Sequence, residues 1–156
     1  MRMLTAILLG GLAAGALDII SAFATFLPQG ASVSGILHYI ASGLIGADAA
    51  NSGGLATAGL GLAVHFALTT AMAGAYVVAA RLAPLLARAP LVCGAIYGVG
   101  LYALMTYVIV PMSAAPGWKP AEGWMLASGL FAHTALVGIP IALIAKRFMP
   151  PTESIA

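Results

Sequence analysis

Charge is the property that this sequence has least of. Only 6% of its 156 residues are charged and 62% are hydrophobic, whereas a water-soluble domain carries charge on roughly a quarter of its residues. Three stretches hold no charge at all, and a fourth holds only Asp18. Each is longer than the ~20 apolar residues that cross a bilayer as a helix. The composition therefore excludes a water-soluble domain and predicts an integral membrane protein. The four stretches are residues 3–47, 49–80, 89–118 and 123–145.

The sequence also lacks the alternation of apolar and polar residues that marks a membrane β-strand. Inside lipid every backbone N–H and C=O must be paired, so each span is expected to be a helix. We predict an all-α integral membrane protein with four transmembrane helices in a single membrane domain, residues 1–156. The predicted helices cover about 3–27, 55–80, 90–113 and 123–146.

Cysteines and soluble-enzyme motifs are scarce as well. The single Cys93 cannot form an intramolecular disulfide and has no metal-site spacing. No Gly-x-Ser-x-Gly, His-Glu-x-x-His or phosphate-binding loop occurs. The net charge of +2 reflects membrane topology and gives no sign of a nucleic-acid partner. We therefore expect a protein that is not an enzyme and whose partner is the lipid bilayer.

The basic residues predict an orientation. With four spans, both termini and the 81–90 loop share one side, and that side holds five of the six Lys and Arg residues. Cytoplasmic segments carry such an excess, so both termini are predicted to be cytoplasmic and Lys119 external. A cleaved signal peptide is the rival interpretation of the first span. Its apolar run is too long for one, and its glycines recur in the third span.

An internal repeat predicts two tandem copies of one helical hairpin. Residues 65–84 and 133–150 both open with His-x-Ala-Leu, at an offset of 68, and both close with Arg-x-x-Pro. We predict parallel hairpin repeats over residues 3–84 and 90–150. At an offset of 83, Gly11, Gly15 and Pro28 match Gly94, Gly98 and Pro111.

The first repeat carries extra residues between its two spans. From Ser32 to Ile45, apolar residues recur at the 3.6-residue spacing of a helix. This pattern predicts a short amphipathic helix on the external side. The helix either lies in the membrane interface or re-enters as a cap over a site, with His38 as the candidate cap residue.

Small and polar residues share one face of the first predicted helix. Such residues let membrane helices approach closely and hydrogen-bond one another, so we expect this face to look inward. A second stripe, on the second helix, includes His65, Thr69 and Tyr76. The first stripe consists of Gly11, Ala14, Gly15, Asp18, Ser21, Ala22 and Thr25.

Three ionisable residues on three helices have the same predicted depth. Asp18, His65 and His133 each lie about ten residues from the external end of their span, or ~15 Å at ~1.5 Å per residue. An ionisable group at that depth is costly unless paired and suggests a functional site. We predict a mid-membrane binding site at these residues, lined by Thr69 and Tyr76. Alternatively, their side chains only hydrogen-bond neighbouring helices and lock the bundle.

Three chemistries fit such a site, and the cofactor stays open between none, a transition metal and haem. A carboxylate and imidazoles can relay protons or cations. Asp18, His65 and His133 could instead ligate zinc, iron or nickel. Haem could also be held between His65 and His133, as in membrane b-type cytochromes.

A further set of features extends from the second span onward: His65, Tyr76-Val-Val-Ala-Ala, Pro84, the Gly94/Gly98 helix, Pro111 and His133. In these features the chain resembles the YagU-like inner-membrane proteins of bacteria. The resemblance covers roughly residues 65 to 147 and implies a four-span protein of the bacterial cytoplasmic membrane. It implies no catalytic residues, and acid tolerance is the one role linked to that family.

The leading functional hypothesis is a small transport or conducting protein for a proton, a metal ion or a small solute. Four slim helices enclose little volume, so we expect a homo-oligomer or a membrane complex. One alternative is a structural or accessory membrane subunit without a substrate. A second alternative is a redox subunit that carries haem or metal.

Overall fold

The computed structural model describes residues 1–148, and within them every regular element is helical. Four helices are long and apolar enough to cross a membrane, and their ends lie within two residues of the predicted ones. The all-α class with four membrane-length helices is therefore confirmed. Pro150, the last residue of the repeat motif, lies outside the described residues. The four spans are Arg2–Gln29, Gly54–Leu82, Pro90–Met112 and Gly123–Phe148.

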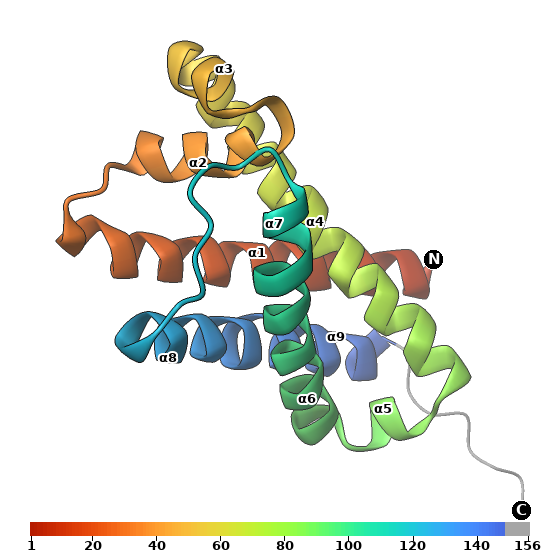
Figure 1. The fold of residues 1–156 in the computed structure, drawn as a ribbon. Coiled ribbons are helices and arrows are strands. Elements are labelled where there is room, and N and C mark those ends of the chain that lie inside the picture. Colours follow the sequence, from red (N-terminus) through yellow and green to blue (C-terminus); the bar gives the residue numbers. More distant parts are fainter. Residues whose placement is uncertain (149–156) are drawn as a thin grey trace, which may run out of the picture.

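The spans are built from the elements labelled in Figure 1. The first comprises α1 (Arg2–Phe26) and the 3₁₀ turn η1 (Leu27–Gln29), and the second is α4 (Gly54–Leu82). The third comprises α6 (Pro90–Leu104), η2 (Met105–Ile109) and α7 (Val110–Met112). The fourth comprises α8 (Gly123–Phe131), η3 (Ala132–Gly138) and α9 (Ile139–Phe148). The connections contain α2 (Val33–Ile45), α3 (Ala47–Ser52) and α5 (Leu85–Arg88).

Glycines bring the two helices of each hairpin into close contact. A Cβ added to Gly15 of α1 would lie 2.7 Å from the Phe66 ring of α4. One added to Gly98 of α6 would lie 2.6 Å from the Thr134 Cα of η3. Gly15 and Gly98 are 83 positions apart, and their contact partners Phe66 and Thr134 are 68 positions apart. These are the two offsets of the internal repeat in the sequence. One turn away, the corresponding contacts are Gly11 with Thr70 and Gly94 with Gly138.

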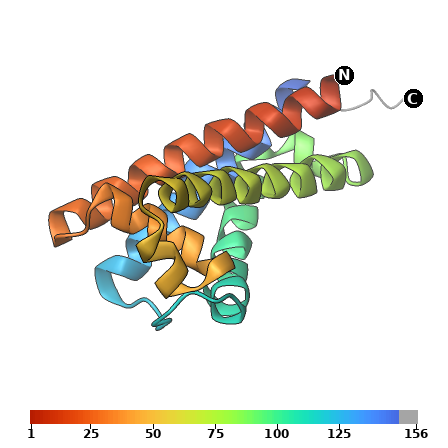
Figure 2. The ribbon, with the colours of Figure 1, turned by 90° about the horizontal axis from the view of Figure 1, so that it is seen from above.

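Helix α1 packs against both hairpins. It contacts α4 within its own hairpin, and η3 and α9 in the other, while α6 also contacts η3 and α9. Figures 1 and 2 both place α1 and α4 side by side. Tyr97 links α6 to α4, because its hydroxyl donates to the Met72 carbonyl at 2.8 Å. Small side chains such as Ala73 and Ala142 fill the shared core.

Both spans of the second hairpin contain a π-helical turn just before a proline. Pro111 follows η2 and Pro140 follows η3. A proline cannot donate to the carbonyl four residues earlier, and local π turns are one way for membrane helices to re-pair such carbonyls. A proline inside a helix is expected to kink it. At Pro140 the local irregularity is the wide turn of η3, in the residues before the proline.

The predicted short helix between the first two spans is present as α2. Ser32 caps its start, since the Ser32 Oγ accepts a hydrogen bond from the Gly35 N–H at 3.0 Å. Gly46, with a φ of 80°, ends it. The helix docks on α4, where a Cβ at Gly61 would overlap the Leu37 carbonyl oxygen. A glycine at position 61 is therefore what lets the inserted helix pack on the second span.

The outward faces of the spans are apolar. Ile20 of α1 is 62% exposed and Ile96 of α6 is 67% exposed, with Val78 of α4 and Leu143 of α9 also exposed. Water-soluble proteins rarely expose large apolar patches, and lipid tails would cover these side chains. The surface is therefore compatible with a multi-pass membrane protein.

Candidate functional site

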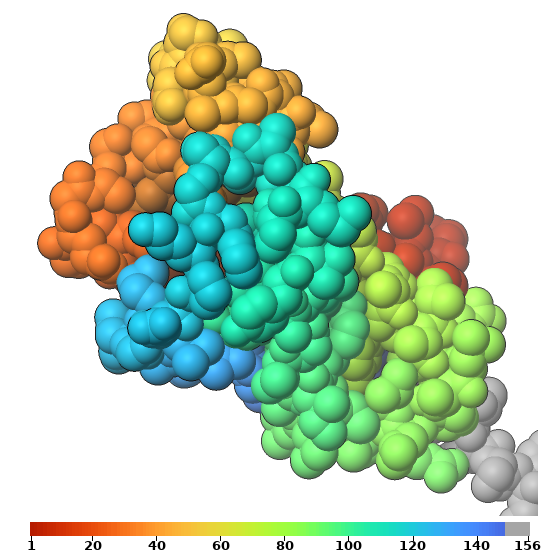
Figure 3. Space-filling model, in the orientation of Figure 1, coloured from red at the N-terminus to blue at the C-terminus, as the bar shows by residue number. Residues whose placement is uncertain are grey.

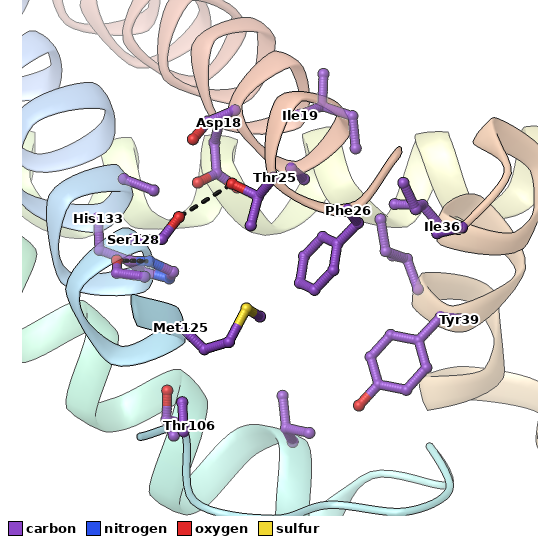
Figure 4. A pocket seen from close by; sticks show the side chains of 18 of the residues that line it. Asp18, Ile19, Thr25, Phe26, Ile36, Tyr39, Thr106, Met125, Ser128 and His133 are labelled. Carbon is purple, nitrogen blue, oxygen red and sulfur yellow. Dashed lines mark hydrogen bonds between the residues drawn. The ribbon is translucent and has the colours of Figure 1, made fainter. Parts of the chain in front are cut away.

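A cavity of about 670 Å³ lies near the end of the bundle where α1 ends and α8 begins. Its walls come from the last turns of α1, from α2, from all three later spans and from the loop 113–122. Figure 4 shows Phe26, Tyr39 and Met125 extending into the space between these elements. Small-molecule sites typically measure roughly 300–1,000 Å³, so this cavity has the size of a ligand pocket.

The three residues predicted to form a site line this one cavity. Asp18 comes from α1, His65 from α4 and His133 from η3. They are far apart in the sequence, so the fold brings them to one place. Within residues 1–148, however, no three His, Cys, Asp or Glu side chains are grouped so that they could hold a metal ion. The three residues therefore share a cavity without forming a three-ligand metal cluster.

His65 ties the two helices of the first hairpin together. Its side chain is 8% exposed, and its Nε2 lies 2.9 Å from the Gly15 carbonyl oxygen of α1. A carbonyl can only accept, so Nε2 carries the proton and Nδ1 is an acceptor in the neutral ring. The ring also stands edge-on to Phe66, with centroids 5.5 Å apart. This histidine therefore has a packing role as well as a place in the cavity wall.

His133 makes its hydrogen bond within its own helix. Its Nδ1 lies 3.0 Å from the Gly129 carbonyl oxygen, so Nδ1 carries the proton and Nε2 is the acceptor of the neutral ring. Tyr102 stands edge-on to the ring, with centroids 5.6 Å apart. The Tyr102 hydroxyl is buried and has no hydrogen-bond partner among residues 1–148. The two histidines that match in the sequence thus differ in their bonding.

A haem held through Nε2 of His65 would break a contact between the helices of the first hairpin. Haem iron needs a free ring nitrogen from each axial histidine. His65 already uses its Nε2 for the carbonyl of Gly15, and that interhelical bond would be lost on ligation through this nitrogen. We therefore derive no function from haem or from a metal held by His65 and His133.

Asp18 is the acidic residue of the cavity wall. It is half-buried, and Thr25 and Ser128 line the same cavity. The hydroxyls of these two residues bond each other at 3.0 Å, and no hydrogen bond to Asp18 is drawn from the residues shown. A carboxylate inside a membrane span is stabilised by a charged or hydrogen-bonding partner. Asp18 is thus the group in the cavity with most to gain from a bound ligand.

Helix α2 and the loop 113–122 cover the cavity. Tyr39 of α2 lines it, as do Trp118 and Lys119 of the loop. The Trp118 indole N–H donates to the Thr106 carbonyl of η2, which fixes the loop to the third span. In Figure 3 the residues of this loop lie between α2 and α8 on the visible face.

Three of the predicted site residues lie outside the cavity lining. His38, the candidate cap residue, is on α2, but other residues of that helix line the cavity in its place. Thr69 and Tyr76 are buried in helix contacts of α4. The hydroxyls and the imidazole all bond backbone carbonyls. These bonds are His38 Nε2 to Gly54 O at 2.9 Å, Thr69 Oγ1 to Phe66 O at 3.2 Å and Tyr76 OH to Leu86 O at 2.9 Å.

Comparisons with known proteins add no family to these observations. No family model, curated protein or solved structure matches the chain. The resemblance to YagU-like proteins therefore stays a prediction. The function has to be inferred from the cavity itself.

Sequence analysis missed several residues of the cavity wall. On the fourth span a signal was present, because the lining residues recur at steps of three and four, the period of one helix face. Tyr102, Thr106 and Val110 of the third span also recur at steps of four, the period of one helix face. Trp118 precedes the fourth span, where a tryptophan commonly anchors a helix at the membrane interface, and this position gives no sign of its place in the cavity wall. The lining residues of the fourth span are Met125, Ser128, Gly129, Ala132 and His133.

Proposed function

We propose that this protein is a small multi-pass membrane protein that binds a small organic solute in the cavity and passes it across the membrane. The observation that carries this proposal is the meeting of Asp18, His65 and His133, from three spans, in one cavity of about 670 Å³. Ionisable residues inside membrane spans are costly and commonly mark substrate pathways.

The size of the cavity favours a solute over a proton or a metal ion. One water molecule takes about 30 Å³ in the liquid, so the space far exceeds what a proton relay needs. A metal ion would need grouped ligands, and no such group exists within residues 1–148. A proton pathway through the two histidines also has little support, because each ring N–H is engaged with a carbonyl.

We further propose that the chain consists of two tandem hairpin repeats in the bacterial inner membrane, with both termini cytoplasmic. The equivalent glycine contacts in the two hairpins support the repeat. The position of five of the six basic residues supports the orientation. In this orientation α2 is external, and the cavity lies at the external end of the bundle.

A structural or accessory subunit is the second candidate function. It is favoured by one observation, the buried hydrogen bond from His65 to the Gly15 carbonyl, which is what a helix lock requires. This candidate needs no solute, so it leaves the cavity without a role.

Accessibility tests the proposed orientation. We expect Ser128→Cys, in a Cys93→Ala background, to react with a membrane-impermeant maleimide added outside intact spheroplasts, because Ser128 lines the cavity. Thr69→Cys is the control. Its position is 4% exposed and outside the cavity lining, so it should stay unlabelled. Labelling of Ser128→Cys only after the cells are broken would place the cavity on the cytoplasmic side.

Uptake into proteoliposomes tests the function. We would measure three labelled solutes, namely tetraethylammonium, naphthalene-2-sulfonate and mannitol. We expect at least one to enter faster than in protein-free liposomes. Ala22→Phe should abolish this uptake, because Ala22 lines the cavity and the ring would occupy it. Ile20→Phe, on the exposed face of the same helix, should leave it unchanged.

The outcomes separate the two candidate functions. Uptake that disappears in Ala22→Phe and persists in Ile20→Phe supports passage through the cavity. No uptake of any of the three solutes by well-folded wild-type protein would contradict the proposal and favour the accessory subunit.

A further inference from the structure

Asp18, His65 and His133 offer a solute in the cavity mainly hydrogen-bond acceptors. The ring N–H groups of His65 and His133 both donate to backbone carbonyls, so each neutral ring has only a lone pair left. The hydroxyls of Thr25 and Ser128 bond each other. An ionised Asp18 only accepts. A solute that fits these groups carries donors or positive charge.

The basic residues of the chain lie elsewhere, with one exception. Arg2 begins α1, Arg81 lies in the last turn of α4, and Lys146 lies in the last turn of α9. These are the helix ends opposite the cavity, so these side chains do not neutralise Asp18. Lys119 does line the cavity, but it is exposed in the covering loop. The far end of the bundle therefore supplies no cation to pair with an ionised Asp18.

Aromatic and apolar side chains make up much of the remaining wall. Phe26 and Tyr39 extend into the space in Figure 4, and Tyr102 and Trp118 also line it. Aromatic faces attract organic cations and, in groups, recognise quaternary ammonium ligands. The buried Tyr102 hydroxyl adds a polar group without a partner among residues 1–148. Such a wall fits a solute with an apolar body.

We propose that the solute is an organic cation with an apolar body and that Asp18 is its counter-ion in the cavity. This inference rests on the proposed function and names its substrate class. An organic anion would face the Asp18 carboxylate in apolar surroundings, where like charges repel strongly. A neutral solute would leave that carboxylate unpaired.

The test uses two probes of the same shape and opposite charge, tetraphenylphosphonium and tetraphenylborate. Binding of each is measured on the purified protein in detergent, with protein-free micelles as the blank. We expect the cation to bind at least ~10-fold more tightly than the anion, since close charge pairs at desolvated sites have effects of this size or more. Binding of both probes should disappear in Ala22→Phe and persist in Ile20→Phe.

The role of Asp18 is tested by a neutral replacement of the same shape. We expect Asp18→Asn to bind tetraphenylphosphonium at least ~10-fold more weakly than wild type and to lose the preference for the cation. Asp18→Glu keeps the charge and should retain the preference. Melting temperatures of both variants show whether the fold is intact. Tighter binding of the anion by wild type, or unchanged cation binding by a folded Asp18→Asn, would overturn the proposal.

Replacing Lys119 gives a second test, in which the direction of the change in affinity is predicted. Its charge is exposed near the entrance of the cavity, so replacing it removes a repulsion for incoming cations. Lys119→Gln should bind tetraphenylphosphonium up to about threefold more tightly at low salt, with the gain fading as salt screens the charge. Weaker binding would contradict the predicted repulsion, because it would show that the Lys119 side chain contributes to binding of the cation.

Failure of this inference can be told from failure of the proposed function. If proteoliposomes take up naphthalene-2-sulfonate or mannitol through the cavity while tetraphenylphosphonium does not bind, the substrate class is wrong and the function stands. If no solute enters and neither probe binds, both proposals fail.

Discussion

Replacing Gly98 by leucine is expected to separate the third and fourth spans and to lower the free energy of unfolding by about 3 kcal/mol or more. A Cβ at this position would lie 2.6 Å from the Thr134 Cα and would overlap the His133 carbonyl oxygen. Both contacts are with backbone, so no side-chain rotation relieves them. Unfolding in detergent by titration with dodecyl sulfate, followed by circular dichroism, measures the loss.

Gly100 provides the matched control on the same helix. It is exposed, and a Cβ there would meet nothing within 4 Å. Gly100→Leu should be neutral or stabilising by up to about 1 kcal/mol, because glycine is a poor helix former. Equal unfolding midpoints for Gly98→Leu and Gly100→Leu would show that α6 does not pack closely on η3.

His65→Ala is expected to lower the free energy of unfolding by about 2–4 kcal/mol, because it empties a buried site and removes a hydrogen bond between helices. The ring is 8% exposed and its Nε2 reaches the Gly15 carbonyl at 2.9 Å. The same unfolding titration measures the effect. His65→Gln, which keeps a donor, should recover part of the lost stability.

His133→Ala should cost less than about 1.5 kcal/mol, because its hydrogen bond lies within one helix and its ring is only half-buried. The comparison tests whether the two matching histidines have different roles. Similar losses for His65→Ala and His133→Ala would contradict the assigned hydrogen bonds. A loss of stability in His65→Ala but not in His133→Ala would show that His65 holds two helices together and that His133 only lines the cavity.

The spans and the inward face of α1 could be predicted because they depend on local composition and helical period. On the predicted stripe of α1, Gly11 and Gly15 are buried against α4, while Asp18, Ser21 and Thr25 line the cavity. Small and polar residues at that spacing can face only protein or water in a membrane. The meeting of Asp18 with the histidines followed from matched depth.

The limits of the cavity could not be predicted in this way. Thr69 lies one turn beyond His65 on the same face of α4, yet the helices close between the two. A stripe of small and polar residues identifies the inward face of a helix. It does not show at which residues of that face a neighbouring helix comes close. The π turns and the docking of α2 on Gly61 likewise depend on partners distant in the sequence. These features arise from tertiary packing that no local pattern encodes.

The tight glycine contacts next to the cavity limit how fast a solute can cross the membrane. The lining ends near Asp18 and His65, and the following turns are held by Gly11 against Thr70. A solute beside Asp18 can leave toward the other side only when these helices part, and collective motions of packed elements take microseconds to milliseconds. We therefore expect carrier kinetics, in which the rate of uptake levels off as solute concentration rises, and no single-channel current.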